Sequence, residues 1–245
     1  MKKTDADHRP WPLPNRPWVM KQTWHHLLFA HWEAAPSLLR PLIPPELMLD
    51  TFEGVAWVAV VPFGMNGIRL RGLPPIPGTA AFPEINVRTY VTHQGKPGVY
   101  FFSLDAANSP AVAAARLLLE LPYYRAAIEL STTAGGDTSY RSRRTHGNAK
   151  PAEFIGGYAP ISEPFRASPG SLDAWLTERY ALYVVRRGSV NRVDIHHQPW
   201  PLQRAEAEIR VNTMAEASGI ALPDAPPLLH YARELDVLIW PPARQ

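Results

Sequence analysis

The chain has 245 residues, of which 46% are hydrophobic, enough to bury a sizeable core in one large β-rich domain. It has no cysteine, which excludes disulfides, thiolate zinc sites and cysteine nucleophiles. The net charge is only +3, and the basic residues are mostly arginines with one short cluster at 141–144 beside a turn signal. A nucleic-acid binder normally has a broader basic face, so we expect a solvated hairpin and no nucleic-acid partner.

The N-terminal segment, residues 1–17, is polar and proline-rich, which makes it a candidate for a flexible tail. It lacks the apolar core of a signal peptide, and no run of about 18 apolar residues follows it, so we expect a cytoplasmic protein with no membrane partner. Trp11, Trp18 and Trp24 near this end and Trp240 near the other are expected to be buried. They would either close the fold or pad a contact in a homo-oligomer.

Seven segments have the β-branched and aromatic content of strands and are separated by Gly and Pro signals: 55–63, 84–93, 98–105, 124–132, 190–197, 205–211 and 228–240. Two helices are predicted, one from Ser109-Pro110 to about Leu121, before Pro122, and one from Ser171 to about Tyr183. The prediction is a single α+β, mainly β domain covering residues 1–245, a sandwich or barrel with a few packed helices.

The segment 84–91 alternates between a polar and an apolar face. Glu84, Asn86, Arg88 and Tyr90 share the polar face. In a sandwich this face would meet water, whereas in a barrel it could line the interior and bind a ligand. The pattern leaves both alternatives open.

The segment 115–124 holds the other candidate residues. Arg116 lies on a narrow polar stripe of the first predicted helix, where it would either pair with Glu120 at the surface or bind an anion from a buried position. Pro122 ends that helix, so Tyr123 and Tyr124 begin the next strand with side chains on opposite faces. Only one of the two can face an interior, and the other would be packed structurally.

Landmarks along nearly the whole chain resemble the YqjF-like family, which is placed near the acetoacetate decarboxylase-like fold: 28–32, 50–58, 84–91, 98–106, 178–180 and 200–202. The segment 115–124 resembles the decarboxylases' catalytic segment, which reads Gly-Arg-Glu, four less fixed positions, then Pro-Lys-Lys. There the first lysine forms a Schiff base with the keto acid and the second lowers its pKa. Here Tyr123 and Tyr124 replace the lysines, while Glu84 resembles the glutamate on a pocket strand.

The resemblance implies an acetoacetate decarboxylase-like antiparallel β-barrel with a pocket for a small organic anion, but it argues against Schiff-base chemistry. We therefore expect Glu84 and Tyr123 to be catalytic and Arg88, Arg116 and Tyr124 to bind a ligand such as a small carboxylate. The alternative is a noncatalytic small-molecule-binding protein. No phosphate loop, nucleophile elbow or His-Glu-x-x-His motif is present, so no cofactor and no metal are expected.

Overall fold

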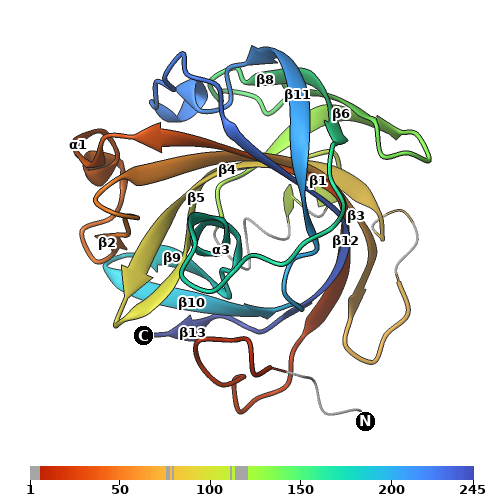
Figure 1. Ribbon diagram of the computed structural model, residues 1–245. Helices are drawn as coiled ribbons and strands as arrows, with labels where there is room; N and C mark the ends of the chain where they lie inside the picture. The colour runs from red at the N-terminus through yellow and green to blue at the C-terminus, as the bar shows by residue number, and fades with distance from the viewer. Residues whose placement is uncertain (1–5, 76–77, 79, 111, 114–120) are drawn as a thin grey trace.

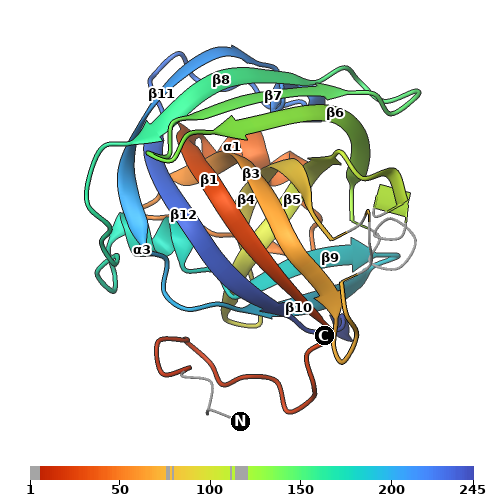
Figure 2. The ribbon, with the colours of Figure 1, turned by 90° about the vertical axis from the view of Figure 1, so that its right-hand side faces the viewer.

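The computed structural model describes residues 6–75, 78, 80–110, 112–113 and 121–245. A 13-stranded sheet has the order β13-β10-β9-β5-β6-β7-β8-β11-β12-β1-β3-β4-β2, shown in Figures 1 and 2. The strands are β1 Met20–Ala34, β2 Met48–Leu49, β3 Ala56–Leu70, β4 Phe82–His93, β5 Lys96–Ala106, β6 Tyr123–Thr132, β7 Thr138–Arg144, β8 Glu153–Pro160, β9 Ala181–Arg186, β10 Ser189–His196, β11 Leu202–Asn212, β12 Leu228–Ile239 and β13 Ala243–Arg244. The short helices are α1 Pro36–Leu39, η1 Arg40–Leu42, α3 Leu172–Thr177 and η2 Glu216–Ser218.

Two further pairings, β5 with β4 and β10 with β12, close this sheet on itself twice. As a result the strands form two closed rings that share one wall, which consists of β12, β1, β3, β4 and β5. The smaller ring is completed by β9 and β10, and the larger ring by β6, β7, β8 and β11. Figure 1 looks into the smaller ring and shows α3 inside it, and Figure 2 shows α3 at one end, with β6, β7 and β8 above β1 and β3.

The shared wall is buried on both faces because each face lines a different ring. In β3 the run from Ala56 to Met65 is buried throughout, as expected for a continuous apolar strand. Val58 and Val60 pack with Tyr140 and Phe154 from the larger ring. The alternate residues of β3, by contrast, join the cluster of the smaller ring that contains Phe29 and Trp200.

The predicted mainly β class is confirmed, and each of the seven predicted strands overlaps an observed one. Six strands were not predicted: β1, β7, β8, β9 and the two-residue strands β2 and β13. In β1 a bulge interrupts the pairing with β3 between His25 and Ala30, and His26 has a positive φ of 48°. The bulge breaks the simple alternation on which strand prediction depends.

The second predicted helix is too long, because α3 ends at Thr177 and residues 181–183 belong to β9. Its N-terminus is as predicted, with the Ser171 hydroxyl accepting a hydrogen bond from the Ala174 amide at 3.2 Å. The Tyr and Val residues after Arg179 favour a strand. Most of the first predicted helix, 109–121, lies outside the described residues, although the Val112 amide donates to the Asn108 carbonyl as in a first helical turn.

Residues 6–17 lie against the end of the smaller ring. His8 contacts the carbonyl oxygen of His197 at 2.8 Å, and the buried Arg9 donates to the carbonyl oxygen of Ile195. Trp240 is buried as predicted and donates to the Arg16 carbonyl at 2.6 Å, whereas Trp11, Trp18 and Trp24 are only half-buried. The flexibility of this segment stays a prediction. No helix among the described residues is long and apolar enough to cross a membrane.

Candidate functional site in the smaller ring

The polar face of β4 lines the interior of the smaller ring. Glu84 is 3% exposed and Arg88 is 9% exposed, and Asn86 and Tyr90 are buried with them. The opposite face packs into the core of the larger ring through Ile85 and the residues that alternate with it. Of the two alternatives that the sequence left open, the structure therefore has the polar side chains inside the barrel.

Glu84 and Tyr123 form a hydrogen-bonded pair in this interior. The Tyr123 hydroxyl donates to Glu84 Oε2 at 2.9 Å, although the two residues lie on different strands. Burial raises the pKa of Glu84 to about 7, while hydrogen bonds from Tyr123 and Asn86 oppose that rise. Burial and the neighbouring Glu84 raise the pKa of Tyr123 well above its ordinary value, so it is a neutral donor. This pair combines a carboxyl group able to exchange a proton near neutral pH with a fixed hydrogen-bond donor.

Asn86 and Arg88 continue the same face toward the other end of the ring. The Arg88 guanidinium lies over the ring of Phe29, 5.3 Å from its centroid, and 6.0 Å from the centroid of Tyr90. Asn86 Oδ1 and Arg88 Nε are buried without a hydrogen-bond partner among the described residues. No described carboxylate forms an ion pair with Arg88.

Tyr90 and Arg179 were not predicted as site residues, whereas His31 was expected to be a core or pocket residue paired by a hydrogen bond. His31 Nε2 lies 2.7 Å from the Tyr90 hydroxyl, and burial holds the pKa of His31 well below its ordinary value, so the imidazole is neutral. Arg179 stacks on the Tyr90 ring at 4.9 Å from the centroid. The signals in the sequence were the place of Tyr90 on the polar face, of Arg179 in the Glu178-Arg179-Tyr180 landmark and of His31 in the landmark at 28–32.

Tyr124 lies on the opposite side of the sheet from Glu84. Its ring is 3.9 Å from the Arg144 guanidinium, which forms a buried two-bond ion pair with Asp105, both contacts at 2.7 Å. The structure thus separates the tyrosine pair as β geometry requires, with Tyr123 in the smaller ring and Tyr124 in the larger. Arg116, the remaining predicted site residue, lies outside the described residues.

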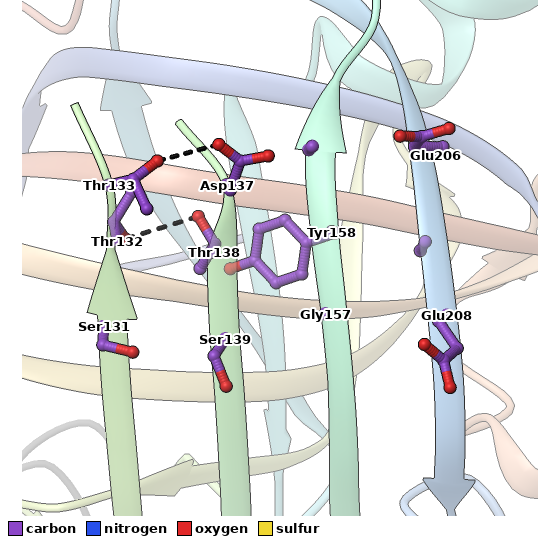
Figure 3. Close-up of a pocket in the computed structure, with 12 residues that line it drawn as sticks. Ser131, Thr132, Thr133, Asp137, Thr138, Ser139, Gly157, Tyr158, Glu206 and Glu208 are labelled. Carbon is purple, nitrogen blue, oxygen red and sulfur yellow. Dashed lines mark hydrogen bonds between the residues drawn. The ribbon is translucent and has the colours of Figure 1, made fainter. Parts of the chain in front are cut away.

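The hollows described for this structure lie away from Glu84. One, of about 690 Å³, runs across the outer face of β6, β7, β8 and β11, and Figure 3 shows Ser and Thr hydroxyls there beside Asp137, Glu206 and Glu208. Another, of about 290 Å³, is lined by Tyr124, Arg144 and aromatic residues of β5. Glu84, Tyr123 and Arg88 line neither of these two hollows.

Other candidate chemistries find no support among the described residues. Lys21, the lysine with apolar sequence neighbours, forms a solvent-accessible ion pair with Asp236 at 2.6 Å. The described lysines at 96 and 150 are half-buried and exposed respectively, neither of them beside Glu84. Within the described part of the chain, no three His, Asp or Glu side chains gather in a way that could hold a metal ion.

Solved structures with the same fold are acetoacetate decarboxylase-like. An acetoacetate decarboxylase-like enzyme from Sphingomonas wittichii RW1 has a TM-score of 0.63 at 15% identity, covering 94% of this chain and 93% of that one. The enduracididine biosynthesis enzyme MppR in complex with pyruvate has a TM-score of 0.60 at 11% identity, covering 96% and 93%. Acetoacetate decarboxylase from Legionella pneumophila has a TM-score of 0.57 at 14% identity, covering 96% and 91%. These likenesses confirm the predicted fold.

Closer relatives establish the family. The family model DUF2071, described as "Uncharacterized conserved protein (COG2071)", matches residues 21–236. The chain is also 53% identical over 230 residues to the uncharacterized protein YqjF of Bacillus subtilis (strain 168), a match that covers 94% of this chain and 93% of that protein. Both findings agree with the landmarks in the sequence, and the chain therefore belongs to the YqjF-like DUF2071 family.

Proposed function

We propose that this protein is an enzyme that performs acid and base chemistry on a carboxylate or carbonyl compound bound inside the smaller ring, without a lysine Schiff base. The observation that carries the proposal is the buried Glu84 carboxyl, with a pKa raised to about 7 and with the Tyr123 hydroxyl 2.9 Å from its Oε2 atom. A general base works best when its pKa lies near the operating pH, because it is then both populated and basic enough.

The geometry supports proton transfer next to a carbonyl group. In its ionised form Glu84 would remove a proton from the carbon beside the carbonyl, which leaves negative charge on the carbonyl oxygen. The Tyr123 hydroxyl, which donates to Glu84 in this structure, would then donate to that oxygen. Return of the proton from Glu84 to carbon or oxygen completes the step, and no external oxidant or cofactor is needed.

An imine mechanism is not supported. Tyr123 stands at the position that corresponds to the decarboxylase lysine, and a phenol cannot condense with a ketone to form an imine. The fold itself is compatible with organic acids, since MppR, which shares it, has been seen with pyruvate bound. Arg88, buried and lacking a described carboxylate partner, supports a ligand with an anionic group.

The second candidate is a noncatalytic protein that binds a small organic anion. Arg88 favours this reading as much as it favours an enzyme, because an unneutralised buried guanidinium supports binding and says nothing of turnover. The Glu84–Tyr123 pair is the observation that favours the enzyme.

The test combines a binding screen and a turnover screen over keto, hydroxy and other carboxylates. Proton NMR in D₂O would follow both C–H exchange and product formation. The matched variants are Glu84→Gln, which keeps the size and hydrogen-bonding capacity of the side chain, and Glu208→Gln, an exposed carboxylate on the outer face. We expect Glu84→Gln to bind but not turn over, and Glu208→Gln to behave like the wild type. Equal turnover in Glu84→Gln refutes the catalytic assignment, and binding without turnover in the wild type supports the second candidate.

A further inference from the structure

Two buried guanidinium groups meet around Tyr90 near the end of the ring occupied by α3. Arg179 lies 4.9 Å from the centroid of the Tyr90 ring and Arg88 lies 6.0 Å from it. Arg179 donates from Nε to the Trp175 carbonyl oxygen at 2.6 Å and from Nη1 to Asp50 Oδ2 at 2.7 Å. Its Nη2 atom and the Nε atom of Arg88 are both buried and have no hydrogen-bond partner among the described residues.

The charges around Tyr90 do not balance. Asp50 is the one described carboxylate that forms an ion pair with either guanidinium, and His31 beside Tyr90 is held neutral by burial. Two buried positive charges therefore face one negative charge. Because an uncompensated buried charge is costly, a bound anionic group would stabilise this arrangement, and the two N–H groups without a described partner are donors available to it.

The distance from this anion subsite to the Glu84–Tyr123 pair limits the size of the ligand. Arg88 follows Glu84 by four residues on the same face of β4, a separation of roughly 13 Å along the strand. Allowing for the side chains, a ligand that contacts both ends has to span about 10 Å. An extended chain advances about 1.2 Å per bond, so this span corresponds to roughly eight bonds, more than a three-carbon acid offers.

The wall between the two ends is apolar. Along β3 the residues paired with the polar face of β4 are Phe63 opposite Glu84, Val61 opposite Asn86 and Ala59 opposite Arg88. All three belong to the buried apolar cluster of the smaller ring. Asn86, with Oδ1 unpartnered, is the one polar group midway. An alkyl or aryl chain fits this wall better than a second charged group does.

The structure points to an elongated monocarboxylate of about six to ten carbons as the ligand, with its carboxylate between Arg88 and Arg179 and its apolar chain beside Val61 and Phe63. This inference rests on the proposed function, because the far end of the chain then presents a carbonyl group to Glu84 and Tyr123. It also assigns a role to Arg179, which the sequence did not indicate, as the second arm of a carboxylate clamp.

Entry from the α3 end is consistent with this orientation. Helix α3 lies within the ring at one end in Figures 1 and 2, and Trp175 on this helix lies 4.7 Å from the Tyr90 ring, centroid to centroid. Two ion pairs hold this segment to the ring wall, Asp173 with Arg204 at 2.7 Å and Arg179, just after α3, with Asp50. Between them Leu172, Trp175 and Leu176 pack against apolar residues of the wall. Displacement of Trp175 would open the ring beside the clamp.

The test is a chain-length series of unbranched monocarboxylates from acetate to dodecanoate, with pyruvate and octanedioate added, measured by calorimetry and thermal shift. We expect the tightest binding at about six to ten carbons and at least about tenfold weaker binding of acetate and pyruvate, because each buried CH₂ adds about 0.8 kcal/mol. Equal affinity for two-carbon and eight-carbon acids, or tighter binding of octanedioate than of octanoate, would overturn the inference.

Charge variants test the clamp in opposite directions. Arg88→Gln should weaken octanoate binding by about tenfold or more, because a charge-assisted hydrogen bond is lost. Asp50→Asn removes the competing carboxylate and should tighten octanoate binding several-fold, a gain that a merely structural role for Arg179 does not produce. Arg71→Gln, which removes an exposed cation packed on Trp18, is the control and should change nothing. Weaker binding in Asp50→Asn refutes the clamp even if Arg88→Gln does not fold.

Failure of this inference and failure of the proposed function give different results. If octanoate and its oxo derivatives bind with the expected length dependence but nothing turns over, the clamp stands and the enzymatic proposal fails. If only three-carbon keto acids are turned over, with loss in Glu84→Gln, the enzymatic proposal stands and the elongated ligand is refuted.

Discussion

The raised pKa of Glu84 makes folding stability depend on pH in a defined direction. Burial takes this pKa from 4.5 to about 7, so the folded state holds the proton more tightly than the unfolded state does. The contribution to stability is complete below pH 4.5 and is lost as the pH rises through about 7. At 1.36 kcal/mol for each pKa unit, the rise in pKa from 4.5 to about 7 means that the free energy of unfolding falls by about 3 kcal/mol across this pH range.

Urea unfolding of the wild type and Glu84→Gln at several pH values between 4.5 and 8 measures this contribution. The glutamine cannot ionise, so the free energy of unfolding of the wild type relative to the variant should fall by about 3 kcal/mol over that range. The comparison cancels the titration of all other groups, and Glu208→Gln serves as an exposed control. A difference that stays constant with pH would mean that Glu84 titrates at its ordinary value and would refute its role as an interior base.

Three further changes probe the residues around this site. Tyr123→Phe removes a hydrogen bond that favours the ionised carboxyl, so the pKa of Glu84 should rise by roughly one unit or more. An NMR titration of Glu84 would measure this pKa, and an unchanged or lower value would contradict the hydrogen bond from Tyr123. Arg144→Met leaves Asp105 buried without its partner and should cost about 3–5 kcal/mol in urea unfolding, whereas a cost below about 1 kcal/mol would indicate a solvated pair. Gly64→Ala should destabilise the fold by about 1–3 kcal/mol, because the new Cβ would lie 2.3 Å from a β1 histidine ring; a neutral result would mean that this ring moves freely.

Local alternation in the sequence was sufficient to predict the two faces of β4 and the separation of Tyr123 from Tyr124. It could not predict which face of β4 would meet a ligand, because both faces are buried, one in each ring. That outcome depends on the pairings of β5 with β4 and of β10 with β12, which close the two rings. Closure is a property of strands far apart in the chain, and no local pattern encodes it.

The same limit explains why the carboxylate clamp was missed. Arg179 follows a six-residue helix whose end was predicted too late, so the predicted helix extended past this residue. Its contact with Tyr90 spans almost ninety residues of sequence and depends on α3 lying inside the ring, where Arg179 lies against both Trp175 and Tyr90. The basic cluster at 141–144 was misjudged in part for a related reason, since Arg144 points inward to Asp105 and is only 3% exposed.

The residue at position 123, a tyrosine where the decarboxylases that this segment resembles carry a lysine, bears on the electrostatics of the Glu84 pair. An ammonium group at this position would favour the ionised form of Glu84 and hold its pKa low. A phenol that donates one hydrogen bond opposes the effect of burial only in part, so the pKa of Glu84 remains about 7. The substitution therefore changes a charged pair into a neutral one in which the carboxyl gains and loses a proton near neutral pH. That property suits the proton transfer that we propose, and it would be absent if position 123 held a cation.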